Sequence, residues 1–172
     1  EESVEEVVVT GSYIKGSPTD GASPVEIINR DEIDNLNAST IADITANIAV
    51  NSGSENNPDS FTQGATQGTS NINLRGLGLS STLVLVDGKR HTLASATAND
   101  GSVFVNTNSI PVIALDRVEV LKEGAASIYG SDAVAGVVNY ILRKDFTGLE
   151  VTVSNQEADV GGQTDDRVGV IW

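Results

Sequence analysis

The side chains best suited to chemistry are few, and their spacing does not support catalysis. The 172-residue sequence contains one histidine, His91, and no cysteine. A serine–histidine–aspartate triad would have to use His91, and the Gly-x-Ser-x-Gly pattern that presents a nucleophilic serine does not occur. His91 follows Lys89 and Arg90, a setting typical of a surface or packing histidine. The sequence therefore predicts that the protein is not an enzyme.

Metal and nucleotide sites are also not indicated. Asparagine and aspartate cluster near 56–59 and at 99–100, and their oxygen atoms could hold a hard cation. These clusters lack the spacing of an EF-hand, so solvated loop residues are the simpler interpretation. The Gly-Leu-Gly at 76–78 is too short for a dinucleotide or phosphate-binding loop. We expect no cofactor and no metal.

The charge balance excludes further classes of function. There are 24 acidic and 10 basic residues, which gives a formal net charge of −14. Nucleic acids and anionic membrane surfaces are bound by an excess of lysine and arginine, so neither is an expected partner. Aromatic residues make up only 4% of the chain, and any core must be aliphatic. Composition alone indicates an acidic, β-leaning domain.

Elements that could position a site begin with a strand expected over 24–28. The Asn-Arg-Asp-Glu at 29–32 has the spacing of a capping box and predicts a helix over about 30–36. The Thr-Ile-Ala-Asp at 40–43 predicts a second helix near 40–48. Three isoleucines lie on one face of that helix: Ile41, Ile44 and Ile48.

Further strands are expected over 71–75, 82–86, 117–121 and 136–142. Asp87-Gly88 is a strong signal for a two-residue hairpin turn. Short helical segments are expected over 110–115 and 125–129, the second ended by Gly130. Residues 51–70 contain one large apolar side chain, Phe61, so they form either a disordered insert or a functional loop.

The end of the chain has a different pattern. Apolar residues alternate with polar ones over 149–154 and again over 168–172, with a polar loop between. Clean alternation with an aromatic end is typical of a transmembrane barrel strand. An ordinary two-stranded edge hairpin would give the same pattern, so both interpretations stay open at this point.

Three segments together resemble a known family. The first is NINLRG at 71–76 followed by LVLVDG at 83–88. The second is an Ile-Pro pair and then LDRVEVL, within 110–121. The third is SIYGSDAVAGVVN at 127–139. Over about residues 5–144 the chain resembles the plug domain of TonB-dependent outer-membrane transporters. Cobalamin and siderophore transporters share the third segment, so it indicates the family and not the substrate.

The resemblance implies an α+β fold, with a mixed central β-sheet, short helices and long apical loops. The family's plug fills the lumen of a 22-stranded barrel. We expect residues 1–22 to be the TonB box and linker, 23–147 the plug, and 148–172 the first hairpin of the barrel, whose other strands are absent from this sequence. The implied location is the outer membrane of a Gram-negative bacterium, with the N-terminus in the periplasm.

The N-terminus is similar to a TonB box, the extended segment that pairs with TonB. Its five residues are Glu6, Val7, Val8, Val9 and Thr10. Main-chain hydrogen bonds carry the affinity in strand addition, so an exposed β-prone segment suffices. The alternative is a plain first strand of the plug sheet. The glycine- and proline-containing linker that follows favours the TonB box, because it would let the segment detach.

Charged residues of the family motifs imply contacts between plug and barrel. By resemblance, Arg75 forms salt bridges with acids of the barrel wall, and Lys122 stands where many members carry a second arginine. A lysine is not bidentate, so a contact at Lys122 would be weaker. Glu119 is expected to pair with either cation. The alternative is that these are solvated charges on the plug surface.

In the family the apical loops contact substrate, and here they correspond to 52–70, 78–82 and 94–102. The candidate substrate-binding residues are almost all neutral donors and acceptors: Asn56, Asn57, Gln63, Gln67, Ser80, Ser81, Thr97, Asn99 and Asp100. Ferric siderophores are often anionic and would favour a basic surface. The neutral loops therefore favour an uncharged saccharide or a cobalamin-like solute over a siderophore.

The leading hypothesis is a plug that gates an energy-coupled outer-membrane importer. It would bind a small-molecule substrate on its apical loops and couple to TonB through the N-terminal box. The barrel that surrounds it would belong to the same chain or to a separate one. The alternative is a stand-alone, plug-like interaction module that works in the periplasm without transport.

Overall fold

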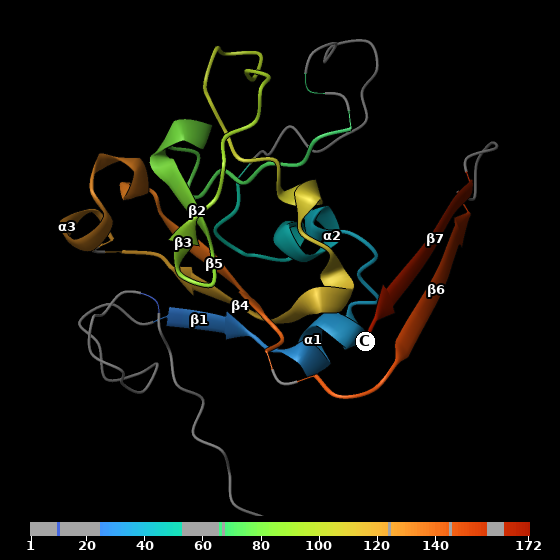
Figure 1. Ribbon diagram of the computed structural model, residues 1–172. Coiled ribbons are helices and arrows are strands. Elements are labelled where there is room, and N and C mark those ends of the chain that lie inside the picture. The colour runs from blue at the N-terminus through green and yellow to red at the C-terminus, as the bar shows by residue number, and fades with distance from the viewer. Residues whose placement is uncertain are drawn as a thin grey trace, which may run out of the picture.

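A five-stranded mixed sheet forms the centre of the computed structural model (Figure 1). The structure describes residues 10, 25–52, 66, 68–123, 125–144, 146–157 and 164–172. The strands of the central sheet are β1 (Val25–Ile28), β2 (Thr82–Val86), β3 (Lys89–Arg90), β4 (Leu115–Leu121) and β5 (Gly136–Leu142). Their order across the sheet is β1-β4-β5-β2-β3, and β2 and β5 are the parallel pair. The mixed sheet with short helices confirms the predicted fold class.

Two short helices, α1 (Arg30–Asn35) and α2 (Ile41–Ala46), follow the first strand. Both begin at the predicted capping boxes. The side chain of Asn29 accepts a hydrogen bond from the backbone N–H of Glu32, and that of Thr40 accepts one from the backbone N–H of Asp43. Their buried isoleucines pack against one face of the sheet, together with Val118, Val138 and Tyr140. The predicted helices and their inward face are confirmed.

The opposite face of the sheet is covered in part by α3 (Ala126–Tyr129) and the segment after it. Leu83, Leu85, Leu121 and Val137 are buried there against Ala133 and its neighbours. Gly130 ends α3 with a φ of 90°, which a glycine adopts easily. The predicted short helix and its glycine stop are confirmed, as is the helical turn near 110–115, seen as a 3₁₀ turn at Val112–Ala114.

The hairpin between β2 and β3 is held by its turn residues. Asp87 and Gly88 both have positive φ, 49° and 75°, as a type I′ turn requires. The backbone N–H of Gly88 donates to Asn139 Oδ1 at 2.9 Å, and the N–H of Leu142 donates to Asp87 Oδ1 at 3.1 Å. The N–H of Asp87 also donates to the Tyr140 carbonyl at 3.0 Å, so three hydrogen bonds tie the turn to β5.

The strand predicted over 71–75 is wrong. Leu74 forms an isolated bridge with Asn51, and no strand covers this segment, which the structure describes in full. Its backbone bonds to the 50–52 segment, where the N–H of Arg75 donates to the Val50 carbonyl at 2.7 Å and the Asn73 carbonyl accepts from the N–H of Ser52 at 2.8 Å. Other backbone groups bond to side chains: the N–H of Asn73 donates to Asn51 Oδ1 at 3.1 Å, and that of Leu74 to Thr82 Oγ1 at 3.1 Å. Ile72 and Leu74 are buried, so the apolar alternation reflects packing in the core, with one bridge to Asn51 in place of a strand of the sheet.

A separate two-stranded antiparallel sheet ends the chain. Its strands are β6 (Glu150–Glu157) and β7 (Thr164–Ile171), and they stand beside α1 and the 112–114 turn (Figure 1). This confirms a hairpin at the end of the chain. Among the residues that the structure describes, none forms a helix with both the length and the apolar character needed to cross a membrane.

Candidate functional site

The N-terminal segment contacts the sheet through Thr10, the one residue of the predicted TonB box that the structure describes. Thr10 is buried, and its backbone N–H donates to Glu119 Oε2 at 3.1 Å. Its hydroxyl donates to the same carboxylate oxygen and accepts from Asn139 Nδ2 at 2.8 Å. Residues 6–9 of the predicted box lie outside the described residues. The assignment of a TonB box stays a prediction.

Glu119 is a buried carboxylate whose charge is matched within the sheet. It has no exposed surface and lies on β4 between Ile27 of β1 and Asn139 of β5. Arg117, two residues away on the same face, contacts Glu119 Oε1 at 2.9 Å and also pairs with Asp116 at 2.7 Å. A buried charge is tolerated only when it is paired and hydrogen-bonded. The predicted pairing of Glu119 with Arg75 or Lys122 is wrong, because Arg117 takes that place.

The two predicted latch cations make contacts inside the domain. Arg75 has a φ of 57° and donates through Nε and Nη2 to the carbonyl of Ala135, at 3.2 and 3.0 Å, and through Nη2 to that of Val134. Arg75 thereby fixes the turn that precedes β5. Lys122 Nζ lies 2.7 Å from Glu26 Oε2, and both side chains are about one-third exposed. Contacts of either cation with a barrel wall stay a prediction.

Two of the predicted apical loops lie together. Ser80 and Ser81 belong to a 3₁₀ turn at Leu79–Ser81, and Leu79 is buried in one cluster with Ala98 and Phe104. The 94–102 loop projects beyond the sheet at the top of Figure 1. Thr97 of this loop forms an isolated antiparallel bridge with Val103, the residue just after it.

The tip of the 94–102 loop carries Asn99 and Asp100. Hydrogen bonds from the backbone N–H and then the hydroxyl of Ser102, both at 2.8 Å, lower the pKa of the exposed Asp100 carboxyl. Asp100 therefore presents a negative charge at neutral pH. The other candidate substrate residues, Asn56, Asn57, Gln63 and Gln67, lie outside the described residues.

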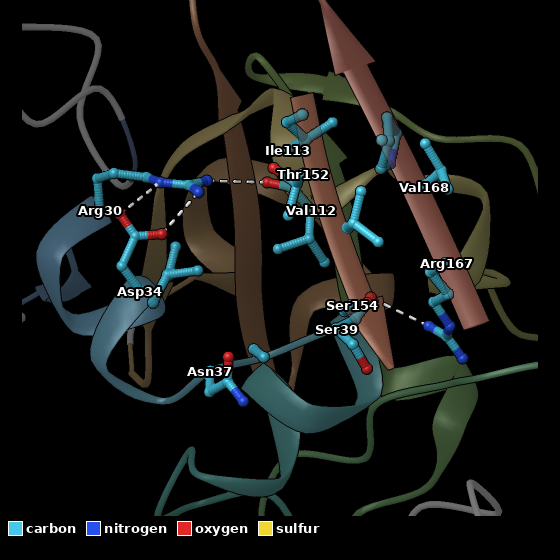
Figure 2. Close-up of a pocket in the computed structure, with 15 residues that line it drawn as sticks. Arg30, Asp34, Asn37, Ser39, Val112, Ile113, Thr152, Ser154, Arg167 and Val168 are labelled. Atoms are coloured by element: carbon cyan, nitrogen blue, oxygen red, sulfur yellow. Dashed lines mark hydrogen bonds and ion pairs between the residues drawn. The ribbon is translucent and has the colours of Figure 1, made fainter. Parts of the chain in front are cut away.

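The terminal hairpin has two unlike faces. Its outward face carries four valines that are each 47–73% exposed: Val151, Val153, Val168 and Val170. The other face lies against the domain, where a Cβ built on Gly169 would be 3.2 Å from Ile113 Cδ1. Arg167 Nη1 also donates to the carbonyl of Ser39 at 3.0 Å, as Figure 2 shows. The hairpin is thus attached by its inward face and leaves an apolar face exposed.

A cavity of about 300 Å³ separates the hairpin from α1 beside these contacts (Figure 2). Polar side chains line it from both sides: Arg30, Asp34, Asn37, Ser39, Thr152, Ser154 and Arg167. Arg30 is held by Asp34 at 2.6 Å and by the carbonyls of Val112 and Leu115. Apolar residues line it as well, among them Ile33, Val112 and Ile113 of the domain and Val153 and Val168 of the hairpin, so the hairpin meets the domain through both polar and apolar groups.

The described residues offer no catalytic or metal centre. His91 contacts the Ser109 hydroxyl at 3.5 Å and the Thr92 carbonyl at 3.2 Å. Neither contact supplies the carboxylate that orients a catalytic histidine. In the parts of the chain that the structure covers, no three histidine, cysteine, aspartate or glutamate side chains gather closely enough to hold a metal ion.

A family model decides the classification. The model described as "TonB-dependent Receptor Plug Domain" matches residues 17–137. The chain belongs to this family. The match covers the central sheet up to the start of β5 and confirms the family predicted from the sequence motifs.

Named relatives agree with this classification. The chain is 32% identical over 166 residues to the vitamin B12 transporter BtuB of Vibrio vulnificus, and this alignment covers 96% of the chain and 24% of BtuB. It is 41% identical over 78 residues to an iron-regulated outer membrane virulence protein of Vibrio cholerae, and this alignment covers 45% of the chain and 12% of that protein. The crystal structure of the siderophore receptor PirA from Acinetobacter baumannii matches with a TM-score of 0.60 and 28% identity, over 85% of this chain and 21% of PirA. The chain therefore spans about a quarter or less of these proteins.

Sequence reasoning missed Arg117 and Asn139, two of the residues that organise the buried polar cluster. One signal was available for Asn139, since it is the polar residue in the otherwise apolar run of β5. A polar residue in the middle of a buried strand needs a hydrogen-bond partner. Arg117 stands two residues before Glu119 on the same strand face, and this spacing indicates an ion pair.

Proposed function

We propose that this chain is the plug and gate of a TonB-dependent importer in the outer membrane of a Gram-negative bacterium. In this proposal residues 1–22 contain the TonB box and linker, 23–147 form the plug, and 148–172 form the first hairpin of the surrounding barrel. The family match and the names of the outer-membrane relatives support this assignment. No nucleic acid takes part, in keeping with the net charge of −14.

The observation that carries the proposal is the orientation of the terminal hairpin. Its polar inward face contacts Ser39 and Ile113 of the plug, and its valines point away. A barrel strand around a plug needs this arrangement, with a polar side toward the lumen and an apolar side toward lipid. An edge hairpin of a protein in water has no reason to expose four valines in register.

The polar contacts within the seam between the hairpin and the domain support a gate. A plug that must move relative to a wall is better held by a few polar contacts than by a continuous apolar core, because the polar groups can exchange partners with water. The seam has one tight packing contact, between Gly169 and Ile113, and a hydrogen bond from Arg167 to Ser39. In the proposal, Arg75 and Lys122 would add contacts to the remaining wall.

Substrate selection follows from the apical residues. The described candidates are neutral apart from Asp100, which is ionised at neutral pH. A negative apical charge disfavours an anionic ferric siderophore by repulsion. An uncharged saccharide or a cobalamin-like solute therefore fits this plug better, although the matched structures include a siderophore receptor, a ferric enterobactin receptor and a ferric citrate transporter.

The test uses the full-length protein that contains this chain, expressed in cells with and without TonB. Uptake of labelled cobalamin, an oligosaccharide and a ferric siderophore would be measured in parallel. We expect uptake of one of these solutes, lost without TonB and lost in a Val8→Pro variant, because proline removes the main-chain donor that strand addition needs. If the uptake of all three solutes is the same with and without TonB, the proposal is refuted and a plug-like module without transport is favoured.

A further inference from the structure

The loops at 52–70 and 78–82 are tied together at their bases by Asn73, which lies between them in the sequence. The Asn73 carbonyl accepts from the N–H of Ser52 at 2.8 Å, and its side-chain Oδ1 accepts from the N–H of Gly78 at 3.0 Å. The peptide unit and the side chain of one residue therefore hold the start of the first loop and the start of the second. This is the first tie between the predicted apical loops.

Asn51 anchors this tie to the body of the domain. Its Oδ1 accepts from the N–H of Asn73 at 3.1 Å, and its Nδ2 donates to the Thr45 carbonyl in α2 at 2.9 Å. Asn73 is thus fixed relative to α2 as well as to the two loops. A side chain that is held by its neighbours in this way can position the groups that it binds.

A second tie joins the end of the first loop to the turn that follows the third loop, 94–102. The N–H of Ser70 donates to Asn106 Oδ1 at 3.1 Å, and the Ser70 carbonyl accepts from the N–H of Thr107 at 2.9 Å. The Thr107 hydroxyl donates to Ser70 Oγ at 2.9 Å, and both residues are buried. A buried hydroxyl that loses its partner costs free energy, so Ser70 and Thr107 depend on each other.

The third tie is apolar and joins the second loop to the third. Leu79 of the second loop is buried in one cluster with Ala98 of the third loop and with Phe104 just after it. The three ties close a ring, in which each loop is joined at its base to the other two. We call this set of contacts the apical ring; its ties are made by Asn73, by Ser70 with Thr107, and by Leu79 with Phe104.

We propose that the apical ring makes the three loops a single rigid surface for the solute, and that Asn73 and Thr107 are positioning residues within it. The inference rests on the proposed function, in which these loops contact the solute. It adds to that function two residues that hold the contacting side chains at fixed separations, although neither belongs to the predicted contact set.

Fixed separations matter because the predicted contact residues belong to different loops. Ser80 and Ser81 lie in the second loop, and Asn99 and Asp100 lie at the tip of the third. A solute that bonds to both loops binds more tightly when they are already ordered, since the ordering of loops on binding lowers the affinity. Loops that move independently would impose this cost at every binding event. The ring therefore raises the affinity without a contact of its own to the solute.

The experiment cuts two ties and follows each cut in a loop to which the substituted residue does not bond. Asn73→Ala removes the Oδ1 acceptor of the first tie, and hydrogen exchange is followed by mass spectrometry in peptides covering 94–105. Thr107→Val removes the hydroxyl that bonds to Ser70, and exchange is followed in peptides covering 77–82. In the full-length protein in detergent, we expect exchange in each of these peptides to be about three- to tenfold faster, because coupled contacts weaken together.

Two kinds of control separate the ring from a general loss of stability. Asn47→Ala is the matched control, because Asn47 also makes a side-chain hydrogen bond to a main-chain carbonyl, that of Asp43 at 2.8 Å, but lies outside the ring. It should leave exchange in both sets of peptides unchanged. Asn73→Asp keeps the acceptor and Thr107→Ser keeps the hydroxyl, so both should restore slow exchange. Faster exchange confined to the residues beside each substitution would overturn the apical ring.

The positioning role is tested by uptake of labelled cobalamin, an oligosaccharide and a ferric siderophore. For the solute that is taken up, Asn73→Ala should raise the concentration at half-maximal uptake about tenfold and leave the maximal rate unchanged, because the loops are ordered once the solute has bound. An unchanged half-maximal concentration would refute the positioning role. If no solute is taken up in a TonB-dependent way, the proposed function fails and the positioning role with it, while hydrogen exchange still decides whether the three loops form one surface.

Discussion

Replacing Gly136 with alanine is expected to destabilise the plug more than any other single added methyl group at the described glycines. Gly136 starts β5 with a φ of 143°, a conformation that side chains rarely adopt. A Cβ there would lie 2.6 Å from the Leu121 carbonyl oxygen and 2.7 Å from Leu74 Cδ1. The carbonyl belongs to the adjacent strand β4, so it cannot move without disturbing the ladder.

Two effects add at this position, and a second glycine separates them. Gly148 has a similar φ of 135°, with no atom within 4 Å of a built Cβ. Gly148→Ala therefore carries only the backbone strain, about 1–3 kcal/mol. Gly136→Ala carries that strain and an overpacking penalty of about 1–3 kcal/mol. We expect Gly136→Ala to lower the free energy of unfolding by about 1–3 kcal/mol more than Gly148→Ala, which is the overpacking penalty.

The assay is hydrogen exchange with mass spectrometry on the full-length protein, because it reports local opening without unfolding a surrounding barrel. Peptides covering β4 and β5 should exchange about ten- to a hundredfold faster in Gly136→Ala than in Gly148→Ala. Since the carbonyl of Ala135 holds Arg75, exchange near residues 74–76 should rise as well. Equal exchange in the two variants would refute the steric argument.

Three smaller predictions concern other parts of the plug. Tyr140 is fully buried, its hydroxyl has no hydrogen-bond partner among the described residues, and burial raises its pKa. The tyrosine of the unfolded chain ionises near pH 10, whereas the folded one stays protonated. The free energy of unfolding therefore falls as the pH rises above about 10. Tyr140→Phe should remove this alkaline loss, which urea unfolding at pH 8 and pH 11 would detect as a smaller drop in midpoint. Gly169→Leu should loosen the hairpin by pressing on Ile113, and added Ile113→Ala should restore slow exchange in β6 if contact is the cause. Thr40→Ala should destabilise α2 by about 1 kcal/mol, because it removes the hydroxyl that accepts from the backbone N–H of Asp43. Thr40→Ser keeps this hydroxyl and should leave the stability of α2 unchanged, and amide exchange in α2 measures both effects.

Much of the local structure could be predicted because its causes lie within a few residues. The capping boxes place a donor and an acceptor three residues apart, and the structure has both. The Asp87-Gly88 turn follows from the left-handed conformations that aspartate and glycine tolerate. The long motif at 127–139 was sufficient to predict the family, which the match over 17–137 confirms.

The candidate site could be predicted only in part. The sequence pointed to Thr10, to Glu119 and to the loops with Ser80 and Asn99. It placed Thr10 in a partner-binding strand and paired Glu119 with the wrong cations, and it gave no reason to connect the two residues. A carboxylate in a strand has several possible cations within reach, and the choice depends on which of them the pleat places on the same buried face.

The sequence by itself determined the elements, the turn chemistry, the family and the alternation of the terminal hairpin, because these depend on backbone preferences and on neighbours close along the chain. Only the tertiary structure decided that Ile72 and Leu74 are buried outside the strands of the sheet, that the hairpin exposes four valines, and that Thr10 meets Glu119 and Asn139. Those contacts join segments far apart in the chain, and a buried polar group takes as its partner whichever segment the fold brings to it.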